Sequence, residues 1–249
     1  MIKKLQSYIS DFDYKELVVS IFWAVLIAVI FRTFLFEPFK IPSGSMIPTL
    51  QVGDYLFVSK YSYGFSRHSF PFSLGPFSGR IMHAEPERGD IIVFKGVRDP
   101  QTFYIKRLIG LPGDKIQMKY GVLHINGTPV ERALIGEMSR KGNFGETRTY
   151  DAYKETLPNG LTYSTLDANV NYHLSFPDVT EEYTVPAGNY FFMGDNRNRS
   201  IDSRFLNDMG FVPADRLLGK ARFLLMSDDF SIIDFITHFN TGRAFSVIR

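Results

Sequence analysis

The chain has 249 residues, a formal net charge of +2 and no cysteine. This length supports one or two domains with a buried core, and the nearly balanced charge gives no reason to expect a nucleic-acid-binding protein. The absence of cysteine excludes disulfides, thiolate metal sites and a cysteine nucleophile. The 24 Phe and 13 Tyr residues suit an all-β or membrane-facing protein.

The first predicted element is an apolar helix over residues 16–36, ELVVSIFWAVLIAVIFRTFLF. About 20 apolar residues match the hydrocarbon core of a bilayer, and Arg32, the single charge after Glu16, lies near one end, where it can reach the headgroups. A cleaved signal peptide would need small residues in an A-x-A arrangement after the apolar run. The residues there are large and aromatic, so we predict an uncleaved single-pass anchor that follows an N-terminal segment, 1–15.

The charges around the anchor give a weak indication of its orientation. Lys3, Lys4 and Lys15 precede it, and Arg32 and Lys40 lie at or beyond its end, which slightly favours an N-terminus inside the cell. No later segment reaches 18 apolar residues. The rest of the chain is therefore expected to form one soluble body on one side of a membrane.

Beyond the anchor, short runs of β-branched and aromatic residues alternate with turns. Tyr120-Gly121 and Asn126-Gly127 are predicted turns, and the Asn-Gly-Thr sequon at Asn126 is interpreted only as part of one. We predict a mainly β protein with an antiparallel body over 37–127 and 183–249 and a smaller β lobe inserted at 128–182. The predicted strands are 54–61, 89–96, 103–111, 121–127, 183–195 and 217–226.

Two further segments depart from the strand pattern. Residues 64–86 are rich in Phe and Pro without a clean period, which fits either an aromatic loop that enters the membrane interface or an ordinary packed loop. Residues 231–239, SIIDFITHF, are expected to form a short terminal helix.

The turn sequence SGSMI places Ser45 shortly after the anchor, and a serine hydroxyl needs a neighbouring base to become a nucleophile. The G-x-S-x-G elbow is absent. The histidines stand in no triad context and offer no H-x-x-x-H spacing for a metal. They are His68, His83, His124, His173 and His238.

A neutral lysine is the other base that a serine can use. Only about 0.04% of an exposed lysine is neutral at pH 7, and burial can lower its pKa by the roughly 3 units required. Lys106, in the apolar stretch TFYIKRLIGLPGD, is the best candidate, and on a strand it faces away from Ile105 and Arg107. The structural alternative is a lysine that protects an edge strand from aggregation.

Four sequence boxes in order closely resemble those of the bacterial type I signal peptidases, the membrane-bound Ser/Lys leader peptidases. The resemblance covers the anchor and most of the body and is weakest over 128–182. Four ordered boxes are highly specific, whereas one alone would not be. They are IPSGSMIPTLQVGD (41–54), RGDIIVFK (88–95), YIKRLIGLPGD (104–114) and GDNRNRSIDSR (194–204).

The resemblance implies that Ser45 is the nucleophile and Lys106 the general base. It also implies that the Ser43 hydroxyl, with the backbone N–H of Ser45, forms the oxyanion hole, and that Ser200 hydrogen-bonds and orients the lysine. Taken alone, Ser43 could equally be a turn residue. The residues that the resemblance assigns to the support of the site are Asp195, Asp202, Arg204 and Arg107.

The last box departs from the family pattern. The family usually reads G-D-N-R-D-N-S, whereas this chain has Asn198 in place of the acid and Arg199 in place of the asparagine. The change adds positive charge beside Ser200. We expect Arg199 to face solvent, because an inward guanidinium would lower the pKa of Lys106 further.

The function that this resemblance implies is removal of N-terminal signal peptides from exported pre-proteins, after small residues, at the surface of the bacterial inner membrane. It implies one transmembrane span in the lipid bilayer, a catalytic β domain on the periplasmic side, a monomer, no nucleic-acid partner, and no metal or organic cofactor. The alternatives are another Ser/Lys hydrolase, a non-catalytic envelope adaptor, and a β domain that binds peptides at a sheet edge. An adaptor would be expected to lack the serine or the lysine, and both are present.

Overall fold

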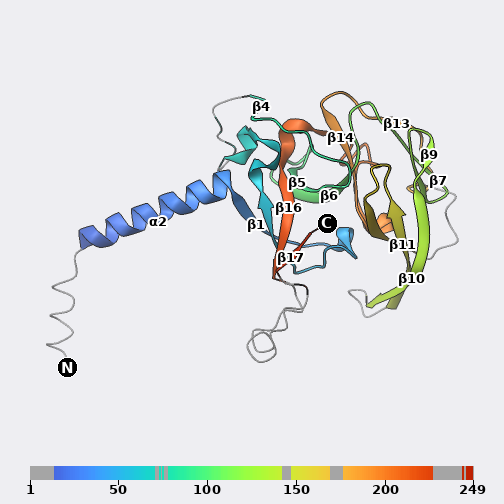
Figure 1. The fold of residues 1–249 in the computed structure, drawn as a ribbon, viewed down its shortest axis with the longest axis horizontal. Helices are drawn as coiled ribbons and strands as arrows, with labels where there is room; N and C mark the ends of the chain where they lie inside the picture. The colour runs from blue at the N-terminus through green and yellow to red at the C-terminus, as the bar shows by residue number, and fades with distance from the viewer. Residues whose placement is uncertain are drawn as a thin grey trace.

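The computed structural model describes residues 14–70, 73, 75, 78–141, 147–168, 176–226, 243 and 245–248. Its first element is helix α2, Tyr14–Phe34, which extends from one side of the β body (Figure 1). Among its 21 residues only Thr33 is buried. Within the described residues it is the one helix long and apolar enough to cross a membrane, as predicted for 16–36.

The helix ends earlier than predicted because the chain enters a sheet at once. Only Leu35 separates α2 from β1, and Phe36, predicted to be helical, pairs with Ser59 of β2. β1 is an edge strand of its sheet, with a neighbouring strand on one side only. Pro38, which has no backbone N–H, is tolerated there because no strand on the open side needs that donor. The helix and the sheet are therefore continuous.

The largest sheet has eight strands in the order β1-β2-β16-β5-β6-β14-β15, with β17 also paired to β16. All its pairings are antiparallel, as predicted. Its strands are β1 (Phe36–Lys40), β2 (Tyr55–Ser59), β5 (Ile91–Lys95), β6 (Phe103–Gly110), β14 (Asn189–Met193), β15 (Val212–Pro213), β16 (Leu217–Met226) and β17 (Ser246–Val247).

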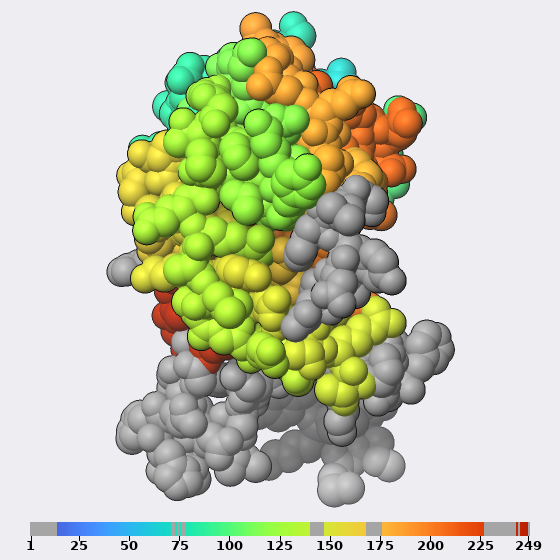
Figure 2. All heavy atoms as spheres, turned by 90° about the vertical axis from the view of Figure 1, so that its right-hand side faces the viewer, coloured from blue at the N-terminus to red at the C-terminus, as the bar shows by residue number. Residues whose placement is uncertain are grey.

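Two smaller sheets lie on the side away from the helix (Figures 1 and 2). One has the order β13-β7-β8-β9 and the other the order β10-β11-β12. The second falls within the segment predicted as an inserted lobe, whereas β9 pairs with β8 of the body. These strands are β7 (Lys115–Lys119), β8 (Val122–Ile125), β9 (Thr128–Pro129), β10 (Glu131–Lys141), β11 (Thr147–Thr156), β12 (Thr162–Ala168) and β13 (Tyr183–Thr184).

The predicted hairpin turns are confirmed. β7 and β8 pair up to Lys119 and Val122, which leaves Tyr120 and Gly121 as the two turn residues, with φ angles of 51° and 77°. Asn126-Gly127 connects β8 to β9 with φ angles of 53° and 80°. Two consecutive positive φ angles give a turn whose twist matches that of the flanking strands.

The segment 64–86 contains a two-stranded sheet of β3 (Phe65–Ser66) and β4 (Arg80–Ile81), and the short helix η3 (Arg67–Ser69). Phe65 and Phe70 both contact the ring of Phe34 at the end of α2. The described part of this segment is thus packed against the helix. The terminal helix predicted at 231–239 lies outside the described residues.

The remaining short helices are η1 (Gly44–Met46), η2 (Lys60–Tyr63), η5 (Arg197–Arg199) and η6 (Ala214–Arg216). One small apolar cluster connects η1 to the three-stranded sheet: buried Ile47 packs with Tyr150 of β11 and Leu166 of β12. Burial of this cluster holds the turn that carries Ser45 against the smaller sheet.

Candidate active site

Ser45 and Lys106 meet in the interior of the β body. Ser45 lies on η1 and is 7% exposed, and Lys106 lies on β6 and is 4% exposed. Lys106 Nζ donates a hydrogen bond to Ser45 Oγ at 2.5 Å. Because β6 lies between β5 and β14, the alternative of an edge-strand lysine is wrong. The two residues are 61 positions apart in sequence, and the sheet brings them into contact.

Burial determines the charge state of Lys106. Loss of hydration lowers the pKa of its ammonium group from 10.5 to about 8, and the positive charge of Arg204 lowers it as well. The carboxylates of Asp202 and Asp195 act in the opposite direction. An amine with a pKa near 8 is partly neutral at physiological pH, and only the neutral form can accept a proton.

Asp195 is held by a buried ion pair beside the lysine. Arg107 Nε and Nη2 donate to its two carboxylate oxygens at 2.8 Å each, and Thr49 Oγ1 donates to Asp195 Oδ2 at 2.5 Å. Arg107 also donates to the Gly89 carbonyl and lies 4.2 Å from the ring centre of Tyr163. Arg107 therefore points to the opposite face of β6 from Lys106, as predicted from strand alternation.

Asp202 and Arg204 form a second buried pair. Arg204 Nε and Nη2 each donate to an Asp202 oxygen at 2.9 Å, and the Gly194 N–H donates to Asp202 Oδ2 at 3.1 Å. Arg204 Nη2 also donates to the Arg197 carbonyl. These bonds fold the segment after β14 back onto itself and place a balanced pair of charges near Lys106.

Asn196 connects this segment to the serine turn. Its backbone N–H donates to the Ser45 carbonyl at 3.0 Å, and its side-chain amide donates to the Gly44 carbonyl at 3.0 Å. Gly194 is needed at the same place, because a Cβ there would lie 2.6 Å from the Ser45 carbonyl oxygen and would overlap Ser200. The position of Ser45 is therefore fixed from both sides.

Ser43 and Ser200 occupy different environments. Ser43 is exposed, precedes η1 in extended conformation and makes no capping hydrogen bond, which leaves its hydroxyl available. Ser200 is 4% exposed, and its hydroxyl has no hydrogen-bond partner among the described residues. The hydrogen bond predicted between Ser200 and Lys106 is therefore not formed in this structure.

The two residues that depart from the family pattern point away from Lys106. Asn198 directs its amide to the carboxylate of Asp178, with both oxygens at 3.3 Å. Arg199 is exposed, as predicted. Asn198 thus places an amide next to Asp178, whereas the acid that the family usually has at this position would be repelled by the Asp178 carboxylate. The added positive charge of Arg199 faces solvent.

Sequence reasoning missed a third buried pair, Glu155 with Arg197. Arg197 Nη1 and Nη2 donate to the Glu155 oxygens at 2.9 and 2.5 Å, and Tyr163 donates to the same carboxylate at 2.8 Å. Glu155 comes from β11, in the segment where the resemblance is weakest, and no local pattern distinguishes it from a surface residue. Asn196 and Thr49 lie inside the sequence boxes that resemble the family, and this position could have identified them as candidate site residues.

Among the residues that the structure describes, no group of three or more His, Asp or Glu side chains is arranged to hold a metal ion. His68, the most buried described histidine, contacts Ser73 rather than Ser45. Among the described residues, Lys106 is thus the titratable group that contacts the Ser45 hydroxyl.

Comparisons with known proteins identify the family of this chain. The family model described as "Signal peptidase, peptidase S26" matches residues 14–226. Proteins named signal peptidase I from Rickettsia canadensis and Rickettsia massiliae are each 44% identical over 213 residues, which cover 84% of this chain and 78% of theirs. A solved signal peptidase I from Enterococcus faecalis is 30% identical and covers 55% of this chain and 97% of its own, with a TM-score of 0.33.

The mainly β body and these matches define the chain as a serine peptidase, a hydrolase. It belongs to the signal peptidase family, peptidase S26, and its relatives carry the name signal peptidase I. Members of this family cleave signal peptides from pre-proteins.

Proposed function

We propose that this protein is a membrane-anchored endopeptidase that removes N-terminal signal peptides from exported pre-proteins with Ser45 as nucleophile and Lys106 as general base. The observation that carries the proposal is the 2.5 Å hydrogen bond between Ser45 Oγ and a buried Lys106 whose pKa is lowered to about 8. A serine next to a partly neutral amine has the base that it needs.

In the proposed mechanism, neutral Lys106 accepts the proton of Ser45 as Oγ attacks the scissile carbonyl. The exposed hydroxyl of Ser43 and the backbone N–H of Ser45 donate to the developing oxyanion. The resulting Lys106 ammonium then donates its proton to the leaving amine, and a water molecule activated by neutral Lys106 hydrolyses the acyl-enzyme. No metal or organic cofactor takes part in these steps.

The other predicted site residues act on the Ser45–Lys106 pair from the surrounding structure. Asp195 with Arg107, and Asp202 with Arg204, are proposed to hold the charge around Lys106 in balance and to fix the segment 194–204. Ser200, whose buried hydroxyl lacks a partner among the described side chains, is proposed to receive and orient the Lys106 amine when the amine leaves Ser45 during turnover.

The proposed location is the bacterial inner membrane, with α2 as a single span and the β domain on the periplasmic side as a monomer. α2 is long and apolar enough to span the membrane, and its apolar side chains are exposed in the structure. Ser45 follows the end of α2 by one short strand. A substrate whose signal peptide is still in the bilayer would present its cleavage site at this height.

The test is cleavage of a purified pre-protein in detergent by the wild type and by Ser45→Ala. Wild type should release one mature product, with its new N-terminus at a single bond. Ser45→Ala should fall to background while it still unfolds cooperatively, with a Tm within about 4 °C of the wild type. A wild type that unfolds cooperatively yet cleaves no exported pre-protein would instead favour a non-catalytic adaptor.

The pH dependence provides an independent prediction. If neutral Lys106 is the base, kcat/KM should rise about tenfold per pH unit below pH 7 and level off above the pKa of about 8. At pH 7 about one-tenth of the enzyme would carry the neutral amine. A profile that levels off near pH 6 would indicate a histidine base and contradict the assignment.

A further inference from the structure

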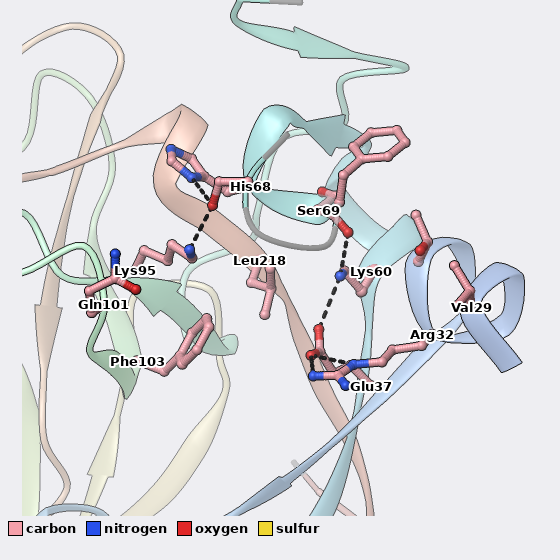
Figure 3. Close-up of a pocket in the computed structure, with 13 residues that line it drawn as sticks. Val29, Arg32, Glu37, Lys60, His68, Ser69, Lys95, Gln101, Phe103 and Leu218 are labelled. Carbon is pink, nitrogen blue, oxygen red and sulfur yellow. Dashed lines mark hydrogen bonds and ion pairs between the residues drawn. The ribbon is translucent and has the colours of Figure 1, made fainter. Parts of the chain in front are cut away.

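A pocket with several charged lining residues lies at the junction of α2 and the β body, and neither Ser45 nor Lys106 lines it. It has a volume of about 400 Å³ and is lined by the end of α2, β1, the short helices η2 and η3, and the strands β5 and β6 (Figure 3). Its charged lining is three cations and one carboxylate, and its apolar lining includes Phe70, Phe103 and Leu218. The charged residues are Arg32, Glu37, Lys60 and Lys95.

The one carboxylate is shared between two of the cations. Arg32 Nε and Nη2 donate to Glu37 Oε1 at 2.9 and 2.6 Å, and Lys60 Nζ donates to Glu37 Oε2 at 3.0 Å (Figure 3). Lys60 is 4% exposed and also donates to the Ser69 carbonyl at 2.5 Å. Burial lowers the pKa of the Lys60 amine against the opposing effect of Glu37. Both Glu37 oxygens therefore accept hydrogen bonds, one from Arg32 and the other from Lys60.

The third cation, Lys95, has no carboxylate partner within the described part of the chain. Its amine donates to Ser73 Oγ at 2.7 Å, and Ser73 Oγ lies 3.1 Å from His68 Nδ1. Burial lowers the pKa of Lys95, the Glu37 carboxylate opposes this shift, and the neighbouring Arg216 and Arg67 lower the pKa further. The three cations outnumber the single carboxylate, so the pocket has a net positive charge in a partly desolvated site, where an anion would be stabilised.

The pocket lies within a collection of aromatic side chains at the end of the apolar helix. Aromatic rings of this kind gather where a membrane protein meets the headgroup region. The pocket would therefore open at the depth of the lipid phosphates. The ring pairs are Phe34–Phe65, Phe34–Phe70, Phe36–Tyr61, Phe36–Phe57 and Phe39–Phe103.

We propose that this pocket binds the phosphate group of an anionic glycerophospholipid. Lys95 and the exposed guanidinium of Arg32 contact the phosphate oxygens, and the acyl chains lie along Val29 and the apolar face of α2. Lys60 and Arg32 both pair with Glu37 and so reduce its repulsion of the phosphate. The inference depends on the proposed membrane anchoring and not on the chemistry of Ser45.

The experiment is native mass spectrometry of the full chain in detergent, titrated with phosphatidylglycerol or with phosphatidylcholine of the same acyl chains. Phosphatidylglycerol should bind at least about tenfold more tightly, and Lys95→Met should remove about that preference. Arg32→Gln should weaken binding in the same direction. Lys119→Met, which removes an exposed lysine on β7, should bind as the wild type does.

Three results would overturn the inference. They are equal affinity for the two lipids, unchanged binding by Lys95→Met, and displacement of the lipid by inorganic phosphate at an equal concentration, which would mark a site for free phosphate. Ser45→Ala should bind phosphatidylglycerol as the wild type does, and Lys95→Met should keep its cleavage activity in detergent. The experiments therefore distinguish an error in the proposed lipid site from an error in the peptidase assignment.

Discussion

Replacing Lys106 by methionine should lower kcat/KM for pre-protein cleavage by at least about 10⁴-fold. Methionine has a similar length but cannot accept a proton, so Ser45 would lose the base that lies 2.5 Å away. The measurement is single-turnover cleavage at pH 8. Lys119→Met is the matched control and should retain full activity, and residual activity above one-hundredth in Lys106→Met would mean that another base serves Ser45.

The same substitution should stabilise the folded protein at neutral pH. The folded pKa of about 8 is below the unfolded value of 10.5, so the unfolded state binds the extra proton and stability rises with pH between these values. At pH 7 the buried ammonium costs about 3 kcal/mol, which methionine removes, less about 1 kcal/mol for the lost hydrogen bond to Ser45. Thermal unfolding in detergent should show a higher Tm for Lys106→Met at pH 7 and a smaller gain at pH 10.

The second large effect is expected for Asp195→Asn. The side chains of Asp195 and Arg107 are 1% and 0% exposed, so the substitution would leave a buried guanidinium without its anion. Breaking a buried pair in this way costs about 3–5 kcal/mol, or roughly 10 °C in Tm for a chain of this size. Because the Asp195 carboxylate raises the pKa of Lys106, any folded Asp195→Asn enzyme should also reach its activity plateau at lower pH.

Two control variants separate these effects of Asp195→Asn. Asp208→Asn removes an exposed carboxylate and should change neither Tm nor the pH profile. Thr49→Val removes one hydrogen bond to Asp195 but keeps the ion pair, and should cost only about 1 kcal/mol. An unchanged Tm in Asp195→Asn would show that the Arg107 pair contributes little to folding.

Sequence reasoning was most successful where local patterns determine structure. The apolar helix, the strand alternation on β6, and the Tyr120-Gly121 and Asn126-Gly127 turns all follow from periodicity and from residues that tolerate positive φ. The predicted C-terminal end of the helix was two residues too late because pairing with Ser59 draws Phe36 into the sheet. Local propensity contains no information on that tertiary contact.

The site was predictable only in part for the same reason. The matched boxes name Ser45 and Lys106, and the fold brings these residues together from positions far apart in sequence. Glu155 could not be found, because its partner Arg197 lies 42 residues away on another element and nothing around Glu155 marks it as buried. Among the described residues the Ser200 hydroxyl has no hydrogen-bond partner, which shows the limit of transferring a role by resemblance: the matched box identifies the residue but does not determine its hydrogen bond.

The direct passage from α2 into β1 implies a fixed distance between the proposed membrane anchor and the turn that carries Ser45. Leu35 is the one residue between them, its N–H still bonds to the Phe31 carbonyl, and its carbonyl accepts from Lys60 of the body. The Arg32–Glu37 ion pair bridges the same joint. A five-residue strand spans about 17 Å, so in the proposed orientation the serine turn stands at a nearly constant height above the bilayer. The distance of the scissile bond from the membrane would then determine which bond is cleaved, and the protein would favour pre-proteins whose scissile bond lies at that height.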